Sequence, residues 1–475
     1  MEKEVISERI ANAEETKFLD SERIKKGSGP RCGKRHEQMV IFFFLLLVSF
    51  SIKVSINIAL VAMTEQTSTY NRTIPTYEWT DKNVIISAFF WGYVLPQVGA
   101  GWLATHYGPK WFLVGSMMAS SIAGFLIPMS AAYFGSKGVM ICRALQGVCQ
   151  GFVIPSVHML LARWVPKDER SMVSSIVYAG TPCGTVFALV VTGYISASSY
   201  GWPMSFYFFN GLSLIWVVWF SLCGYSSPGD HPTISQEEKY YIETSLGFVE
   251  NKKVSSTPWK RILTSTPFWA LVLTQSGFTW GFWTLLSEIP LYMDKVMRFN
   301  LKSNSLLSSL PYLSHWLFMI LSGYIADQLM SRKIFKVRTV RRLMNSVGFT
   351  APAIALFILG DSGPESAIKA LVLLVIAVGV SAIASNGFFI NHMDLSPNHA
   401  GVIMGISNFL ASLCAIAAPL FVQVFVTDEH NPNQWKIVFY SASAIYIVSN
   451  FVFICFGSTN VQPWNEDDSE DGEKV

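Results

Sequence analysis

Charged residues are scarce in this chain, and their scarcity excludes a soluble globular protein. Only 14% of the 475 residues are charged, whereas 51% are hydrophobic and the mean hydropathy is +0.37. A soluble domain typically carries about 25% charged residues. The composition therefore predicts an integral, all-α membrane protein whose surroundings are a lipid bilayer.

Paired cysteines and nucleotide-binding motifs are also missing. The seven cysteines are scattered, nearly all inside apolar runs, so their spacing predicts neither disulfide bonds nor a zinc site. The net charge of +3 is small, and its distribution matters more than its total. We expect no cofactor, no metal and no nucleic-acid partner, and we expect the protein not to be an enzyme.

Long apolar runs make up most of the chain. Residues 1–38 form a polar tail without a signal-peptide pattern. Runs long enough to cross a bilayer then follow at about residues 39–63, 84–105, 111–134, 139–164, 172–195, 205–226, 267–292, 305–327, 343–360, 367–391, 401–427 and 437–457. We therefore predict twelve transmembrane helices.

The runs divide into two sets of six. A polar linker at 227–266 separates an N-terminal six-helix bundle at 39–226 from a C-terminal six-helix bundle at 267–457, and an acidic tail follows at 458–475. GWLATHYGPK at 101–110 recurs as GYIADQLMSR at 323–332, each after the second helix of its set. Parallel halves with a substrate site between them are typical of the major facilitator fold.

The repeated motif predicts a gate that ties neighbouring helices together at the cytosolic end. Its candidate residues are Gly101, Gly108, Lys110, Gly323, Asp327 and Arg332. The first copy has Thr105 where the second has Asp327, which indicates either a weaker gate contact or a difference in packing.

The distribution of basic residues orients the predicted helices. The loops and tails on the side of the two termini hold 25 Lys and Arg residues, and the loops on the other side hold 8. The positive-inside rule places both termini in the cytosol. The motif Asn71-Arg72-Thr73 fits N-glycosylation of Asn71 on the opposite side.

Two cations lie deep inside apolar runs. Arg143 is followed by Gln146 and Gln150 at helical spacing, so the three share one polar face that cannot face lipid. Lys53 is ten or more residues from either end of its run, about 15 Å along a helix, too far to reach the surface easily. Since buried cations need neutralising, we expect a small anionic substrate between them; the alternative is that they cap carbonyls or pair with distant acids for folding.

Several polar residues near these cations are further candidates. The segments FFWGY at 89–93 and TWGFWTLLSE at 279–288 predict either cavity walls or plain packing, with Tyr93 as a donor to the anion. His158 is a candidate proton relay or gate, or a structural histidine. Asn386, Asn391 and Asn408 are candidate oxygen ligands of a coupling cation.

Longer motifs resemble one family. RALQGVCQGFVIP, ARWVPKDERS, GWPMSFYFF, SPGDHPTISQEEKYYI, INHMDLSPNHAGVIMGISN and FGSTNVQPW are similar to motifs of the anion:cation symporters of the major facilitator superfamily, which include type I sodium-phosphate cotransporters, sialin and vesicular glutamate transporters. The resemblance spans about residues 38–464. It implies transport of an anion coupled to Na+, H+ or the membrane potential, with Arg143 and Lys53 at the substrate positions.

Departures from the family pattern narrow the implied function. Gln150 replaces the proton-coupling glutamate of the sialin-like and glutamate-transporting members, and Ile86 and Phe278 replace the histidine and arginine of the latter. The pattern looks most like the inorganic phosphate cotransporters of invertebrates.

We expect a monomeric symporter of phosphate or an organic anion that works by alternating access, with Na+ as coupling ion, in the plasma membrane or an endolysosomal or vesicular membrane. The alternatives are an organellar exporter of acidic sugars or amino acids driven by H+ or potential, and a non-transporting anion sensor.

Overall fold

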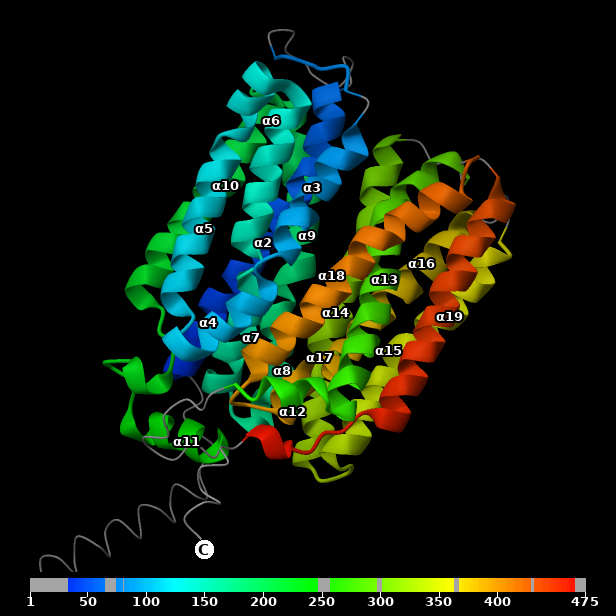
Figure 1. Ribbon diagram of the computed structural model, residues 1–475. Coiled ribbons are helices and arrows are strands. Elements are labelled where there is room, and N and C mark those ends of the chain that lie inside the picture. The colour runs from blue at the N-terminus through cyan, green and yellow to red at the C-terminus, as the bar shows by residue number, and fades with distance from the viewer. Residues whose placement is uncertain are drawn as a thin grey trace, which may run out of the picture.

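The described part of the protein is built of helices. The computed structural model describes residues 33–64, 74–79, 81–246, 257–296, 301–362, 367–428 and 431–465, and contains no strand in these ranges (Figure 1). Residues 1–32 and 466–475 of the predicted tails lie outside the described residues, as does Asn71 of the glycosylation motif.

The first half contains six helical crossings, several of them broken into two helices. Their elements are α2 (Lys34–Thr64), α3 (Lys82–Val94), α4 (Gln97–Tyr107), α5 (Lys110–Phe125), α6 (Ile127–Gln150), α7 (Val153–Trp164), α8 (Arg170–Tyr178), α9 (Gly180–Ala197) and α10 (Gly201–Cys223). The pairs α3–α4, α6–α7 and α8–α9 each continue one crossing.

Gly135 divides what would otherwise be an overlong helix. The helical stretch 127–164 is 38 residues, or about 57 Å at 1.5 Å per residue, almost twice the thickness of a bilayer core. Gly135 has φ 62° and ψ −150°, a backbone conformation open almost only to glycine. The third crossing therefore ends just before Gly135 and the fourth begins after it, within the predicted gap between 134 and 139.

The second half repeats the pattern after a short linker. The linker contains α11 (Gln236–Leu246) and α12 (Trp259–Leu263), and the six crossings contain α13 (Thr266–Lys295), α14 (Leu301–Ser331), α15 (Val337–Gly360), α16 (Ala367–Ser381), the 3₁₀ turn η4 (Ala382–Asn386), α17 (Phe388–Leu395), α18 (Ala400–Phe425) and α19 (Pro432–Phe456). α16, η4 and α17 share one crossing.

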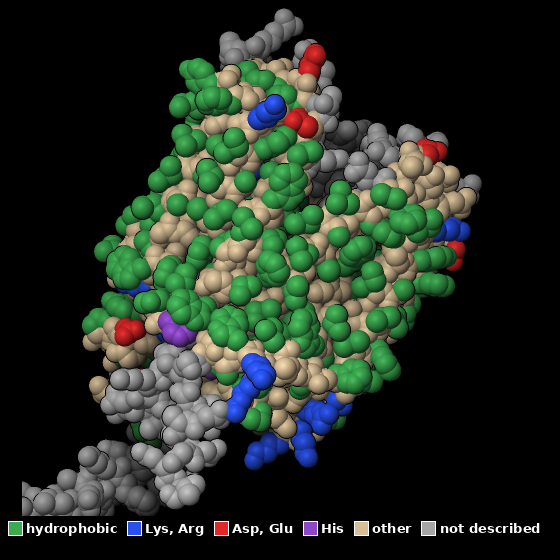
Figure 2. Space-filling model, in the orientation of Figure 1, with side chains coloured by type: hydrophobic (Ala, Val, Ile, Leu, Met, Phe, Trp, Pro, Cys, Tyr) green, Lys and Arg blue, Asp and Glu red, His purple; other side chains and the backbone are tan. Residues whose placement is uncertain are grey.

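The helices fit a bilayer by length and composition. Within the described residues, eight helical stretches are long and apolar enough to span, or nine when the pair 84–94 and 97–104, bent by 41°, is counted as one span. Hydrophobic side chains are spread over the whole body of the face in Figure 2, and Lys and Arg side chains gather at its lower edge. α5 is shorter because its crossing continues into α6.

The two halves stand side by side, and their apolar cores are in contact. One large cluster of buried residues joins α2, α7, α9 and α10 and extends into the second half through Met319, Met393 and Met404, and another joins α13, α15, α16 and α19. α11 and the stretch 457–465 lie at the same end of the molecule, which we call the linker end (Figure 1). The halves meet there through α4 with α18 and α8 with α14.

α2 begins at Lys34, five residues before the apolar run predicted at 39. The reason is a cap from the linker: the Glu238 carboxylate on α11 accepts hydrogen bonds from the backbone N–H groups of Lys34 (2.9 Å) and Arg35 (3.0 Å). A carboxylate at a helix N-terminus also complements the helix dipole. This contact attaches the linker to the first half.

Candidate functional site

Arg143 lies on α6, only 1% exposed, and reaches across to α2. Its Nη2 donates to the carbonyl oxygen of Lys53 (3.0 Å), and its Nη1 donates to the carbonyl oxygen of Ile52 (3.3 Å) and to Oε1 of Gln146 (3.1 Å). Its Nε is buried and has no partner in the described part of the chain. Arg143 therefore ties α6 to α2, the structural role that the sequence left open, and keeps one unpartnered donor.

Gln146 and Gln150 continue this polar face into the first half. Gln146 donates to the carbonyl oxygen of Ser120 on α5 (3.3 Å). Gln150 donates to the hydroxyl of Ser120 (3.1 Å) and accepts from the hydroxyl of Ser49 on α2 (3.0 Å). The partners of Gln150 are both neutral, so Gln150 joins three helices without any group that could carry a proton.

Lys53 is surrounded by aromatic rings. Its side chain is 8% exposed, and the Nζ atom lies within 5.3 Å of five ring centroids. The rings belong to Phe50 (5.1 Å), Phe89 (5.3 Å), Phe90 (4.7 Å), Tyr93 (4.6 Å) and Trp283 (4.6 Å). We call this set the aromatic cage. Ring faces attract a desolvated cation, so the cage stabilises the ammonium where a carboxylate would otherwise be needed.

The cage lies where the two halves meet. Trp283 comes from α13 in the second half, and its ring packs edge-on against Phe90 of α3, with centroids 4.8 Å apart. Asn408 on α18 donates to the Tyr93 hydroxyl (3.3 Å) and accepts from Gln275 on α13 (3.3 Å). The Lys53 ammonium is therefore enclosed by both halves.

Arg143 and Lys53 form one positive site. Both cations lie over the same ring, Phe89, with the Arg143 guanidinium carbon 4.8 Å from its centroid. Within the described residues, no carboxylate lies within ion-pair distance of either one. Two neighbouring buried cations repel each other and have lost water, so an anion between them would lower their free energy.

His158 does not face this positive site. It is fully buried on α7, where its Nε2 lies 3.2 Å from the carbonyl oxygen of Phe389 and its Nδ1 is hydrogen-bonded to the Tyr178 hydroxyl. The His392 ring is 5.5 Å away, centroid to centroid. The histidine thus packs between the halves, nearer the linker end.

The three candidate asparagines are not brought together. Asn386 contacts Ser175 and Ser322 at the junction of α8 and α14, and Asn391 donates to the carbonyl oxygen of Ser458 (2.8 Å). Asn408 alone lies beside the aromatic cage, through Tyr93. A shared coordination site for one cation is therefore not formed by these three side chains in this conformation.

The second copy of the gate motif makes a direct contact between halves. Asp327 accepts hydrogen bonds from the backbone N–H groups of Ser171 (3.2 Å) and Met172 (2.6 Å), in the first turn of α8. Gly323 faces Ser175 so closely that an added side chain would clash. Arg332 is exposed.

The first copy makes its contact through glycine. An added side chain at Gly101 would collide with the backbone carbonyl of Gly401 on α18. Gly108 has φ 81°, a left-handed conformation that ends α4. The Lys110 ammonium lies over the rings of Trp111 (5.2 Å) and Tyr225 (4.8 Å). The side chain of Thr105 lies outside the described residues.

An ion triad at the linker end was missed by the sequence analysis. The Asp394 carboxylate on α17 binds Arg170 of α8 (3.1 Å) and Arg341 of α15 (2.8 Å), and both arginines are buried. Arg341 also donates to the Ser171 hydroxyl (2.8 Å). The signal was present: Arg170 and Asp394 lie inside two of the quoted motifs, Arg170 at the start of α8 and Asp394 near the end of α17, where charges are usually solvated.

The structure has two helical halves around a buried positive site. A comparison with known proteins identifies the family to which this fold belongs. Residues 41–419 match the Major Facilitator Superfamily profile. The chain belongs to this superfamily. A Drosophila melanogaster protein named "Putative inorganic phosphate cotransporter" is 38% identical over 84% of this chain and 76% of its own. Homo sapiens sialin is 33% identical over 91% of both chains. Danio rerio vesicular glutamate transporter 3 is 32% identical over 90% of this chain and 73% of its own.

These relatives place this Major Facilitator Superfamily member among the anion:cation symporters, which are transporters and not enzymes. Two solved structures share the fold. The proton:xylose symporter XylE has a TM-score of 0.68 at 14% identity, covering 89% of this chain and 96% of that chain. A bacterial homologue of the iron transporter ferroportin, in an outward-facing state, has a TM-score of 0.64 at 14% identity, covering 88% and 98%. The protein is thus a multi-pass secondary transporter.

Proposed function

We propose that this transporter carries phosphate or an organic anion together with Na+. The observation that supports the proposal most is the pair of buried cations, Arg143 and Lys53, next to each other without a carboxylate among the described residues. A guanidinium offers donors in a fork that matches phosphate or carboxylate oxygens, and an ammonium adds a compact charge. The unpartnered Nε of Arg143 supplies one such donor.

The aromatic cage acts as a substitute for the anion. While no substrate is present, the five rings stabilise the Lys53 ammonium; a bound anion would draw it out of the cage toward Arg143. Because Trp283 belongs to the second half, this movement would change a contact between the halves. Anion binding is in this way coupled to the rocking of the halves that alternating access requires.

Neutral partners around Gln150 favour Na+ over H+ as the coupling ion. A glutamine does not titrate, and its contacts are two serine hydroxyls. Phe278 occupies the position at which the resemblance implies an arginine in glutamate-transporting members. Its side chain packs against Phe282, Phe349 and Phe388. The site therefore has no third cation there for a larger dicarboxylate. Carrying one negative charge inward against 100 mV costs about 2.3 kcal/mol, which cotransported Na+ would offset.

We further propose that the linker end faces the cytosol, because the positive-inside rule favours the cytosol for the side with more basic residues. The contacts through Asp327 and Gly101 then close the cytosolic side of the pathway, so the conformation described is one in which substrate would enter from the opposite side.

The test is uptake of labelled phosphate into proteoliposomes under an imposed Na+ gradient, a pH gradient or a potential alone. We expect uptake to require Na+. Arg143→Ala should reduce it by about 100-fold, since a charge-assisted hydrogen bond pair contributes about 3 kcal/mol. Lys53→Arg, which keeps the charge, should retain most of it.

Lys260→Gln, an exposed cation on α12, serves as the control and should transport normally. Folding of Arg143→Ala is checked by size-exclusion chromatography and thermal unfolding. Absence of phosphate flux with folded wild-type protein under every gradient would refute phosphate as substrate. Flux driven by pH alone would refute Na+ coupling and favour the organellar exporter, to which the 33% identity with sialin points.

A further inference from the structure

The loop between α14 and α15 combines exposed basic and exposed apolar side chains at the linker end. Together with the first two residues of α15, its sequence at 332–338 is RKIFKVR, and we call this segment the RKIFKVR loop. The four cations, Arg332, Lys333, Lys336 and Arg338, are exposed. Among the apolar residues, Ile334 is 55% exposed, Phe335 43% and Val337 43%. Figure 2 shows Lys and Arg side chains gathered at this end, below the apolar face.

Backbone hydrogen bonds hold the loop against the end of α14. The N–H of Lys333 donates to the carbonyl of Met330 (2.9 Å), and those of Ile334 and Phe335 donate to the carbonyl of Leu329 (3.1 and 3.3 Å). Lys333 has φ 56°, a left-handed conformation uncommon for a residue other than glycine. The apolar side chains of Ile334 and Phe335 directly follow this helix ending and are exposed.

The cations of the loop have no partner of opposite charge within the described residues. No carboxylate there forms an ion pair with any of the four, and the first turn of α15 contains no acidic residue. One turn later, Nε of Arg342 is buried without a partner. Two buried cations of the linker end, in contrast, are paired: Arg35 with Glu169 and Arg341 with Asp394. The unpaired charges therefore favour an anion that comes from outside this part of the chain.

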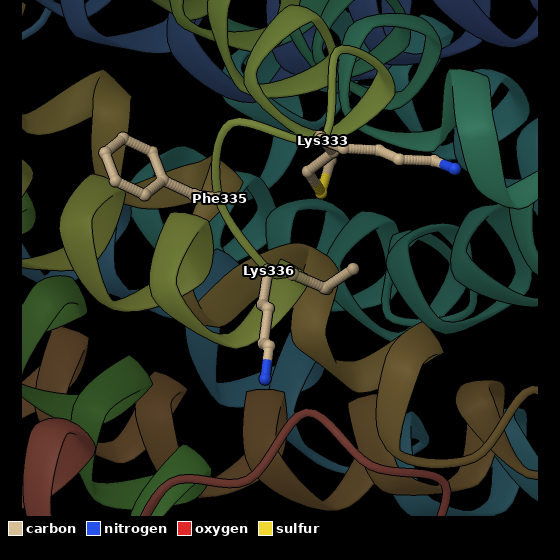
Figure 3. Close-up of a pocket in the computed structure, with 5 residues that line it drawn as sticks. Lys333, Phe335 and Lys336 are labelled. Atoms are coloured by element: carbon tan, nitrogen blue, oxygen red, sulfur yellow. The ribbon is translucent and has the colours of Figure 1, made fainter.

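A hollow of about 390 Å³ lies within the loop, lined by Met330, Lys333, Phe335, Lys336 and Val337. In Figure 3 the Lys333 and Lys336 ammonium groups extend away from each other, and the Phe335 ring extends to a third side. The aliphatic stems thus form the walls, while the two charges lie at the rim. Such an arrangement suits a phosphate headgroup attached to apolar chains.

We propose that the RKIFKVR loop binds the headgroup of an anionic phospholipid. The Lys333 and Lys336 ammonium groups attract the anionic headgroup from two sides of the hollow, and Ile334, Phe335 and Val337 lie among the acyl chains at the membrane boundary. A free phosphate ion would use the charges but would leave these apolar side chains in water. With the orientation proposed above, the lipid belongs to the cytosolic leaflet, which is the anionic one.

The test is binding of dioctanoyl phosphatidylserine to the purified full-length protein in a non-ionic detergent, followed by microscale thermophoresis. Each basic residue near an anionic lipid contributes about 1 kcal/mol, so Lys333→Gln/Lys336→Gln should weaken binding by about 30-fold. The affinity of wild type should also fall as salt rises, because these charges are exposed. Lys167→Gln/Lys260→Gln removes two exposed cations elsewhere at the linker end and should bind like wild type.

Dioctanoyl phosphatidylcholine and inorganic phosphate are the comparison ligands. Equal binding of phosphatidylcholine would overturn the proposal, as would equal binding by the two double variants or no binding by wild type. Binding of inorganic phosphate that is lost with Lys333→Gln/Lys336→Gln and competes with the lipid would assign the loop to a free anion instead. None of these results depends on transport, so they are independent of the proposed substrate.

Discussion

The two halves of the transporter meet at the linker end through two interfaces that have the same motif but opposite chemistry. In the charged interface, Asp327 of the second half accepts hydrogen bonds from the N–H groups of Ser171 and Met172 at the start of α8. The side chain of Glu169, the N-cap residue of α8, makes no capping hydrogen bond within the described residues. A carboxylate from the other half therefore caps the helix and complements its dipole.

In the glycine interface, α4 and α18 approach until backbone meets backbone. Gly101 faces the carbonyl of Gly401, and Gly405 faces the carbonyl of Gln97. Close approach through small residues is a common way for helices to pack where burial of apolar area gives no driving force. One side chain hydrogen bond, from Gln97 to Ser412 (3.3 Å), accompanies it.

The difference shows that one repeated motif can join the two halves in two physically distinct ways. The charged interface depends on the orientation of its hydrogen bonds and on the charge of the Asp327 carboxylate. That carboxylate regains water when the halves separate, so its net contribution to the stability of the interface is modest. Loss of one buried partner is nevertheless costly. The glycine interface depends on shape, and any added atom opposes it. The two should respond differently to substitution.

Asp394→Ala should give the largest effect, because it leaves the buried arginines Arg170 and Arg341 without their carboxylate. Removing one partner of a buried ion network typically costs about 3–5 kcal/mol. We expect a corresponding loss of thermal stability in detergent, measured by differential scanning fluorimetry. Asp361→Ala, which removes an exposed pair with Lys436, is the control and should change little. Equal shifts for both variants would contradict the importance of the triad.

Gly101→Ala should open the glycine interface without touching a charge. The new methyl group meets the Gly401 carbonyl, which cannot rotate away, so α4 and α18 must separate at a cost of about 1–3 kcal/mol. We expect faster maleimide labelling of a cysteine introduced at Met159, a buried residue beside Gly401. Gly99→Ala is the matched control, since a methyl group there meets nothing. An unchanged rate of maleimide labelling in Gly101→Ala would show that α4 and α18 can accommodate the methyl group without separating.

Much of the fold was predictable from the sequence because lipid imposes simple rules. Apolar runs of sufficient length predicted the twelve crossings, and the break at Gly135 fell in the gap left between two of them. The aromatic segments flagged as cavity walls supply four of the five cage rings, Phe89, Phe90, Tyr93 and Trp283. Hydrophobic patterns are local features of the sequence. They therefore predict structure wherever a side chain contacts lipid or its own helix.

What could not be predicted depends on contacts between distant segments. Arg170, Arg341 and Asp394 come from three different crossings, and nothing in their local sequence pairs them. The three candidate asparagines lie apart for the same reason. The sequence predicts how deep in the membrane a residue lies along its helix, but not which neighbour its side chain contacts. Asn391 contacts the stretch after α19, and Asn386 contacts α8 and α14.

Asp327→Asn should give the smallest effect and sharpens the comparison most. The amide oxygen can still accept a hydrogen bond from Ser171 or Met172, but the charge that complements the α8 dipole is lost, a cost of about 0.5–2 kcal/mol. Labelling of a cysteine introduced at Ser174, buried on α8, should rise by about 2- to 30-fold, while Met159 of the glycine interface is read out in parallel. Asp327→Glu keeps the charge and should restore part of the protection. If labelling at position 159 rises to the same degree, the halves separate as rigid bodies and the two interfaces open together. If only labelling at position 174 rises, the charged interface opens independently of the glycine interface.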